Sequence, residues 1–177
     1  MKQLPEVNQD IRSRLKDITC FALDMDGTVY LGTKWIEGAV DFLKAVEQAG
    51  KQYIFLTNNS SKGPENYVEK LAAMGLIVTK DRIVTSGQAT ISYLKKHYPG
   101  KRVYLLGNDL LQREFQEEGI LLAENDPEVV VTGFDTSLTY EKLCRVCDHV
   151  RASLYCNPSR LQLSYGGWLY PGYRLFS

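Results

Sequence analysis

The sequence predicts an α/β fold, in which short apolar strands alternate with amphipathic helices. Apolar runs of strand length recur along the chain, and most are followed by a segment with apolar residues at helical spacing. Glycine or proline ends several of these segments, as is common at helix ends and turns. The 177 residues can form one domain or two small ones, and 44% hydrophobic residues suffice for a core.

The most informative strand is the apolar run 18–23, which ends in Asp24, Met25, Asp26 and Gly27. This pattern predicts a buried, central strand that opens into a polar loop, where open α/β sheets place their sites. Asp24 and Asp26 lie two positions apart and so lean to the same side of an extended chain. Two close carboxylates repel unless a cation or a proton lies between them, and Mg²⁺ prefers oxygen ligands. The alternative is an acidic turn after a core strand.

A second strand at 53–56 also runs into a polar loop, which begins with Thr57, Asn58 and Asn59. We expect this strand beside the first, because parallel strands of one sheet bring their carboxyl ends together. Hydroxyl and amide groups can hydrogen-bond phosphate oxygens without adding negative charge. The alternative is that these residues cap the next helix.

The remaining elements continue the alternation and predict a second α/β layer. A small hairpin is expected at 29–32, and the loops that follow two later strands carry Asp109 and Asp135, which either face a substrate or are ordinary turn residues. Helices are expected at 8–16, 37–48, 65–74, 88–97, 110–118 and 140–151, and further strands at 102–106, 129–132 and 153–156. The segment 83–87 leads into the helix at 88–97.

The string from Asp24 to Gly32 resembles the first motif of the haloacid dehalogenase (HAD) superfamily of phosphohydrolases. The string from Thr57 to Ser61 resembles the second motif, and its doubled Asn is similar to the nitrophenylphosphatase-like (NagD-like) branch. The Ser-Gly-x-Ala-Thr string at 86–90 marks, in that branch, the approach to a cap domain. The resemblance implies a HAD-like, doubly wound (Rossmannoid) core with an inserted α/β cap of type 2.

The resemblance also implies an activity, the hydrolysis of phosphate monoesters. Asp24 would be the nucleophile, and Asp26 the general acid and base. Asp24 and Asp26 would also hold a Mg²⁺ cofactor, Asp26 through its backbone carbonyl. Gly27, Thr57, Asn58 and Asn59 would bind the phosphate of a small phosphorylated metabolite.

The resemblance covers roughly residues 19–158, and it implies that the core is truncated. Residues 1–82 would be the N-terminal part of the core, 83–158 most of the cap, and 159–177 a tail. Two later motifs of the family, a lysine and an acidic strand end, do not follow Pro158, and neither Lys34 nor Lys62 occupies the family's lysine position. The alternative to an impaired hydrolase is therefore a catalytically defective remnant that only folds, binds or associates.

The tail itself suggests a change of reading frame. One allowed encoding of residues 159–168, read one base later, gives Pro-Asp-Cys-Asn-Cys-Pro-Thr-Glu-Gly-Gly, which resembles the family's continuation after Asn-Pro. Apolar residues in the tail show no clean helical or strand period, and we expect it to pack poorly. The competing interpretation is a natural or designed short form.

The amino-acid composition indicates which kinds of binding partner and which cellular location to expect. Lys plus Arg equals Asp plus Glu, 21 each, which argues against a nucleic-acid partner. No window resembles a membrane span, and the polar N-terminus lacks the apolar centre of a secretory signal, so we expect a cytoplasmic protein. Association with further copies is expected to be possible through an exposed core edge or the cap.

The four cysteines leave a zinc site as an alternative, because Cys144 and Cys147 lie near His149 and Cys156. No second Cys pair occurs at zinc-ribbon spacing, and the Cys144–Cys147 pair falls in an expected helix. We therefore expect buried free thiols, as in reduced cytosolic proteins.

Overall fold

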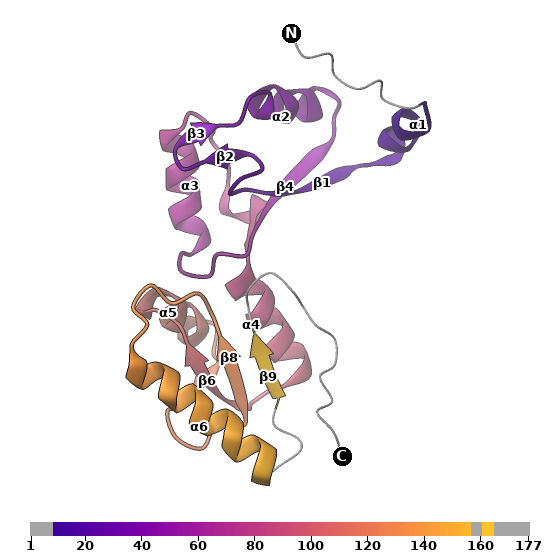
Figure 1. The fold of residues 1–177 in the computed structure, drawn as a ribbon. Coiled ribbons are helices and arrows are strands. Elements are labelled where there is room, and N and C mark those ends of the chain that lie inside the picture. Colours follow the sequence, from indigo (N-terminus) through magenta and orange to yellow (C-terminus); the bar gives the residue numbers. More distant parts are fainter. Residues whose placement is uncertain (1–8, 157–160, 165–177) are drawn as a thin grey trace. The chain divides into compact units, whose positions relative to one another are not determined.

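The computed structural model describes residues 9–156 and 161–164. The chain divides into two compact units, residues 1–56 and 57–177, which are drawn in Figure 1. Both units contain helices, and each contains at least one pair of parallel strands. The predicted α/β fold class is thus confirmed. The expected domain limits at residues 82 and 158 stay predictions.

The first unit is built on two parallel strands, β1 and β4. The register places Cys20 opposite Gln52 and Asp24 opposite Leu56, which confirms that the two predicted strands are neighbours. The elements are α1 (Gln9–Asp17), β1 (Cys20–Asp24), β2 (Tyr30–Leu31), β3 (Lys34–Trp35), α2 (Ala39–Gln48) and β4 (Gln52–Thr57).

Strand β1 is neither central nor buried, and this part of the prediction is wrong. Its residues alternate between half-buried positions, such as Phe21, and exposed positions, such as Ala22. Among the described strands β1 pairs only with β4, so it is an edge strand of the described sheet. Phe21 packs edge-on against Phe42 of α2, with ring centroids 5.5 Å apart. The burial of an apolar strand depends on neighbours that a local pattern cannot report.

Helix α2 follows the predicted apolar stripe, and its Leu43 and Val46 are buried. Gly50, with φ of 67°, donates its backbone N–H to the carbonyl of Glu47 at 2.9 Å and ends the helix as predicted. The expected hairpin also forms, because β2 and β3 pair antiparallel and place the rings of Tyr30 and Trp35 6.3 Å apart.

The second unit contains a parallel four-stranded sheet in the order β7-β6-β8-β9. Helices alternate with its strands, which confirms the predicted second α/β layer (Figure 1). The elements are α3 (Pro64–Ala73), the short 3-10 helix η1 (Lys80–Arg82), β5 (Ile83–Thr85), α4 (Ser86–His97), β6 (Arg102–Leu106), α5 (Asp109–Glu117), β7 (Leu121–Leu122), β8 (Val129–Thr132), α6 (Tyr140–Cys156) and β9 (Leu161–Ser164).

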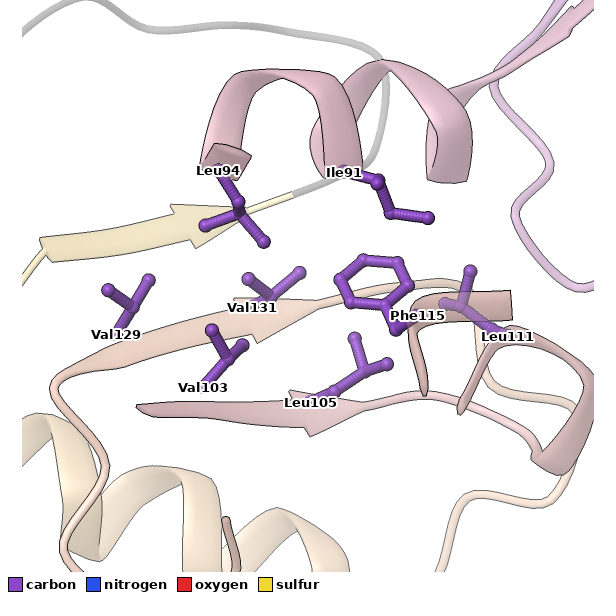
Figure 2. Packing of buried hydrophobic residues seen from close by; sticks show 8 residues of the cluster. All are labelled: Ile91, Leu94, Val103, Leu105, Leu111, Phe115, Val129 and Val131. Atoms are coloured by element: carbon purple, nitrogen blue, oxygen red, sulfur yellow. The ribbon is translucent and has the colours of Figure 1, made fainter. Parts of the chain in front are cut away.

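The core of this unit lies on both faces of β6 and β8. One face packs against α4 and α5, and Figure 2 shows the cluster that results, whose members are Ile91, Leu94, Val103, Leu105, Leu111, Phe115, Val129 and Val131. The other face, with Tyr104, Leu106 and Val130, packs against Val146 of α6. Burial on both faces explains why these strands read as continuous apolar runs.

The C-terminal part of the prediction needs two corrections. Residues 153–156, expected as a strand, are the end of α6, because the apolar stripe of Val146 and Val150 continues at helical spacing to Leu154. Within the tail, which we expect from the sequence to pack poorly, Leu161–Ser164 forms β9 and pairs in parallel with Val129–Thr132. Residues 157–160 and 165–177, the rest of the tail included, lie outside the described residues. No helix in the described ranges is long and apolar enough to cross a membrane.

Candidate active site

Asp24 is the last residue of β1, and its side chain is exposed. Its carboxylate Oδ2 accepts a hydrogen bond from the hydroxyl of Thr28 at 3.1 Å. Between them the backbone turns sharply: Gly27, with φ of 86°, donates its N–H to the carbonyl of Tyr30 at 2.8 Å. Glycine adopts this left-handed conformation without steric cost. The turn leaves the Asp24 carboxylate at the open end of the strand.

Asp26 lies inside this turn and is also exposed. It forms a backbone bridge with Tyr30, whose hydroxyl lies 3.5 Å from Asp26 Oδ2. Tyr30 itself is buried against Trp35 of the hairpin. The hairpin β2–β3 therefore helps to fix the position of Asp26.

The carboxylates of Asp24 and Asp26 are suitable ligands for a hard cation, but two residues supply only part of the ligands that it needs. Each supplies the oxygen donors that Mg²⁺ prefers. Among the described residues, however, no group of three or more His, Cys, Asp or Glu side chains converges as a metal site. Water molecules and phosphate oxygens would have to complete the coordination.

The second motif follows Leu56, the residue that pairs with Asp24 in the neighbouring strand. Thr57 is buried, and its hydroxyl accepts a hydrogen bond from the N–H of Asn59 at 3.2 Å and lies 3.5 Å from the hydroxyl of Tyr67. The amide oxygen of Asn59 accepts bonds from the N–H and the hydroxyl of Ser61, at 3.0 and 2.7 Å. These bonds fold residues 57–61 into a compact loop.

Asn58 differs from its neighbours because its residue surface is exposed. Its backbone carbonyl accepts a hydrogen bond from the hydroxyl of Ser86 at 3.1 Å. The helix that follows, α3, begins after Gly63, so Thr57, Asn58 and Asn59 are not its N-cap and that alternative is wrong.

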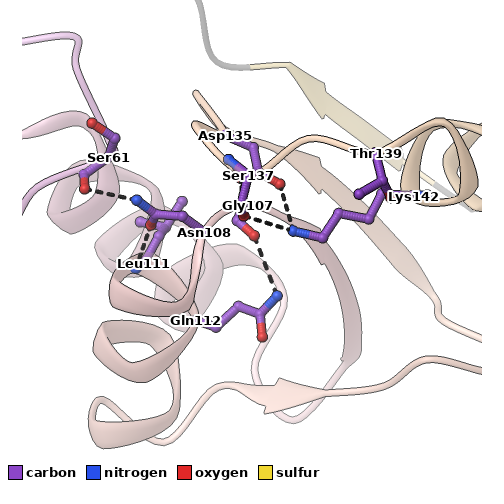
Figure 3. Close-up of polar contacts among 9 residues, drawn as sticks. All are labelled: Ser61, Gly107, Asn108, Leu111, Gln112, Asp135, Ser137, Thr139 and Lys142. Atoms are coloured by element: carbon purple, nitrogen blue, oxygen red, sulfur yellow. Dashed lines mark hydrogen bonds and ion pairs between the residues drawn. The ribbon is translucent and has the colours of Figure 1, made fainter.

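The two later loop acids behave differently from each other. Asp109 is an exposed residue in the first turn of α5. The side chain of Asp135 is only 2% exposed and forms an ion pair with Lys142 at 2.8 Å, as drawn in Figure 3. Burial raises the pKa of Asp135, but hydrogen bonds from Lys142 and Ser137 lower it, and the net pKa lies below the ordinary value. Asp135 therefore has a structural partner within its own unit.

The cysteines do not form the expected buried set. Cys20 and Cys147 are exposed free thiols, and Cys144 is half-buried. Cys20 is exposed because it lies on the outward side of β1. The part of the chain that the structure describes brings no metal-binding cluster together around them.

Sequence reasoning did not find two polar contacts of the second motif: one joins Asn108 to Ser61, and the other joins Phe134 to Ser60, itself a residue of the motif. Asn108 donates its side-chain N–H to the carbonyl of Ser61 at 2.9 Å (Figure 3). Ser60 accepts a hydrogen bond from the backbone N–H of Phe134 at 2.8 Å. The partners are 47 and 74 positions apart, so no local pattern could have indicated them.

Comparison with known proteins gives a consistent family. The model of the haloacid dehalogenase-like hydrolases matches residues 21–121. An acid sugar phosphatase of Staphylococcus aureus (strain USA300) is 39% identical over 131 residues, which are 73% of this chain and 50% of that protein. The chain thus spans about half the length of the curated relatives it matches.

Solved structures of similar proteins indicate the same family. The 4-nitrophenylphosphatase of Thermotoga maritima matches with a TM-score of 0.76 and 38% identity, over 85% of this chain and 56% of that one. A glycerol phosphate phosphatase of Mycobacterium tuberculosis, solved in complex with magnesium, matches with a TM-score of 0.68 and 28% identity, over 77% of this chain and 42% of that one. The chain therefore belongs to the haloacid dehalogenase-like hydrolases, and within them it resembles the nitrophenylphosphatase and NagD-like branch.

Proposed function

We propose that this chain carries the nucleophile and the general acid of a phosphate monoester hydrolase. The single observation that carries the proposal is the exposed Asp24 carboxylate at the C-terminal end of β1, with Asp26 two positions further in a tight turn. Parallel sheets place their sites at this end of the strands. The membership in a family of hydrolases and the relatives named phosphatases support the same chemistry.

The proposed reaction has two steps. Asp24 attacks phosphorus, the bond to the leaving oxygen breaks, and Asp26 gives that oxygen its proton. The products are an alcohol and an aspartyl-phosphate on Asp24. Asp26, now ionised, takes a proton from water, and the resulting hydroxide attacks phosphorus. The bond between phosphorus and the Asp24 carboxylate breaks, which restores Asp24 and releases inorganic phosphate as the second product.

The phosphate group is assigned to Gly27, Thr57, Asn58 and Asn59. Gly27 lets the backbone approach the ligand closely. The register supports the assignment of the Thr57 loop, since Leu56 just before it is the strand partner of Asp24. Asn58, whose residue surface is exposed, can donate its side-chain amide to a phosphate oxygen.

Mg²⁺ is the proposed cofactor, held by the carboxylate of Asp24 and the backbone carbonyl of Asp26. When bound it offsets the negative charge of carboxylate and phosphate, so that the two anions can approach. The match to a phosphatase solved with magnesium is consistent with this choice.

The proposed substrate is a small phosphorylated metabolite in the cytoplasm, such as a sugar phosphate. The staphylococcal relative is named as an acid sugar phosphatase. A formal net charge of zero does not favour nucleic acid. The edge of β1 away from β4 is the proposed surface for association with a second copy.

Turnover by the 177-residue chain is proposed to be slow. Catalysis of phosphoryl transfer depends mostly on positioning and charge stabilisation, and the described residues bring no third acidic group to Asp24 and Asp26. The same observation favours the second candidate, a defective remnant that folds and binds without turnover.

Trapping the intermediate tests the nucleophile even when turnover is slow. The chain is mixed with p-nitrophenyl phosphate and Mg²⁺ and quenched with sodium borohydride, which reduces an acyl phosphate to an alcohol. Peptide mass spectrometry should find the alcohol at position 24 in the wild type and none in Asp24→Asn. Release of p-nitrophenol that leaves position 24 unmodified would refute the aspartyl-phosphate route.

A further inference from the structure

Three hydrogen bonds tie the loop 58–61 to distant parts of its own unit. Ser86, at the start of α4, donates to the carbonyl of Asn58. Asn108, at the end of β6, donates to the carbonyl of Ser61, and the N–H of Phe134, just beyond β8, donates to the hydroxyl of Ser60. The loop is thus held at the carboxyl ends of two strands of the β6–β8 sheet.

These bonds are shielded from water. Ser60 is 3% exposed and Asn108 is 9% exposed. A buried donor that loses its partner retains its desolvation cost, so such bonds are expensive to break. The loop position is therefore coupled to the position of the sheet.

The backbone also approaches closely at this point. A Cβ atom added to Gly133 would lie 3.0 Å from the Ser60 hydroxyl and 2.6 Å from Leu111 Cδ2. A side chain at position 133 would require Leu111 and Ser60 to shift, next to the bond between the Phe134 N–H and Ser60. Packing and hydrogen bonding thus favour one arrangement of the loop.

We infer that Asn108 and Ser60 are positioning residues that hold the phosphate-binding loop 57–61 in its binding conformation. The inference rests on the proposed function, because it is the phosphate-binding role of Thr57, Asn58 and Asn59 that makes the loop geometry matter. The proposal gives neither residue the role of a phosphate ligand. Their effect is exerted through the backbone carbonyl of Ser61 and the hydroxyl of Ser60.

The chemistry of Asn108 offers a discriminating variant. Its Oδ1 accepts the N–H of Leu111 at 3.0 Å and caps α5, while its Nδ2 donates to Ser61. Asn108→Asp keeps the capping oxygen and loses the donor, since Asp is a good helix cap but has no amide. Gln112→Ala is the matched control: it removes a bond at 3.3 Å to the Gly107 carbonyl from the same helix and leaves the loop bonds intact.

The experiment uses the full chain in Mg²⁺ buffer with inorganic phosphate as the probe. Isothermal titration gives the phosphate dissociation constant, and thermal melting gives stability. Asn108→Asp and Ser60→Ala should weaken phosphate binding about tenfold, because the free energy with which one buried hydrogen bond holds the loop would then have to be supplied by binding. Gln112→Ala should bind phosphate as the wild type does.

The outcomes separate the two claims. If the wild type binds phosphate and Asn108→Asp binds it equally well, the positioning role is wrong and the proposed function stands. If Asn108→Asp melts earlier but its folded form keeps the wild-type affinity, Asn108 is structural only, and the inference is again wrong. If the wild type does not bind phosphate, the proposed function is wrong, and the inference, which depends on it, is wrong as well.

Discussion

The ammonium group of Lys142 lies 2.8 Å from the carboxylate of Asp135, which is almost completely shielded from solvent. Lys142 also donates to the hydroxyl of Ser137 at 3.0 Å. The pair joins the loop after β8 to the first turns of α6 (Figure 3). A buried carboxylate that loses its cation keeps an uncompensated charge, so this contact should matter more than a surface ion pair.

We expect Lys142→Met to lower the free energy of unfolding by about 1–3 kcal/mol, the cost of an unsatisfied buried charged group. Lys95→Met is the control, because its pair with Glu118 is half exposed on both sides and should contribute about 0–1 kcal/mol. Chemical denaturation of both variants measures the difference. Equal, small effects would show that the Asp135 pair contributes no more than a surface contact.

The lowered pKa of Asp135 adds a pH dependence with a definite sign. The folded state holds the proton less tightly than the unfolded state, so the stabilisation is present above the ordinary Asp range near 3.8 and is lost as the pH falls through the lower folded pKa. The difference in free energy of unfolding between the wild type and Asp135→Asn should therefore become smaller as the pH is lowered. A gap that stays constant down to strongly acidic pH would contradict this account.

Glu114 shows the opposite sign. Burial, and then the charges of Glu65, Glu118 and Glu117, raise its pKa above the ordinary value of 4.5. The folded state binds this proton more tightly, so stability should fall as the pH rises from about that value through the raised pKa. Glu114→Gln should be more stable than the wild type at pH 7 and lack this component of the pH profile. Melting curves from pH 4 to 8 test it, with Glu69→Gln as control, because Glu69 is exposed and is not among the charges that raise the Glu114 pKa. A wild-type advantage at pH 7 would refute the prediction.

Many helices and strands of this fold depend on local sequence patterns and could therefore be predicted from the sequence. The strands at Arg102–Leu106 and Val129–Thr132 were predicted with their observed bounds, because each is a strong apolar run between turn residues. β7, with only two residues, is too short for any periodicity to indicate. The exposure of β1 depends on which strands flank it, and that information lies outside the strand.

The candidate site shows the same division. Asp24, Asp26 and the residues after Thr57 stand out because polar groups directly follow apolar strands. Asn108 does not stand out, and neither does the contact of Ser60 with Phe134, since both contacts join segments far apart in the chain. The residue types Asn and Ser are equally common in ordinary turns and caps.

Mg²⁺ binding should be weak in this chain. Asp24 and the Asp26 carbonyl supply only part of an octahedral shell, and water must supply the rest. Isothermal titration should give a shallow curve that disappears in Asp24→Asn. Tight binding that is lost in Asp24→Asn would mean that a further ligand from the chain has been overlooked.

The most direct test of the account is steady-state hydrolysis of p-nitrophenyl phosphate with Mg²⁺, comparing the wild type with Asp24→Asn. Among the described residues no third acidic group joins Asp24 and Asp26. The lack of one preorganised electrostatic group typically costs about 10²–10³ in rate, and such costs do not simply multiply. We therefore predict turnover several powers of ten below the enzyme median of about 10 per second, and lower still in Asp24→Asn. A rate unchanged in Asp24→Asn would contradict the assignment of the nucleophile, and turnover near the median would contradict the impairment of this chain.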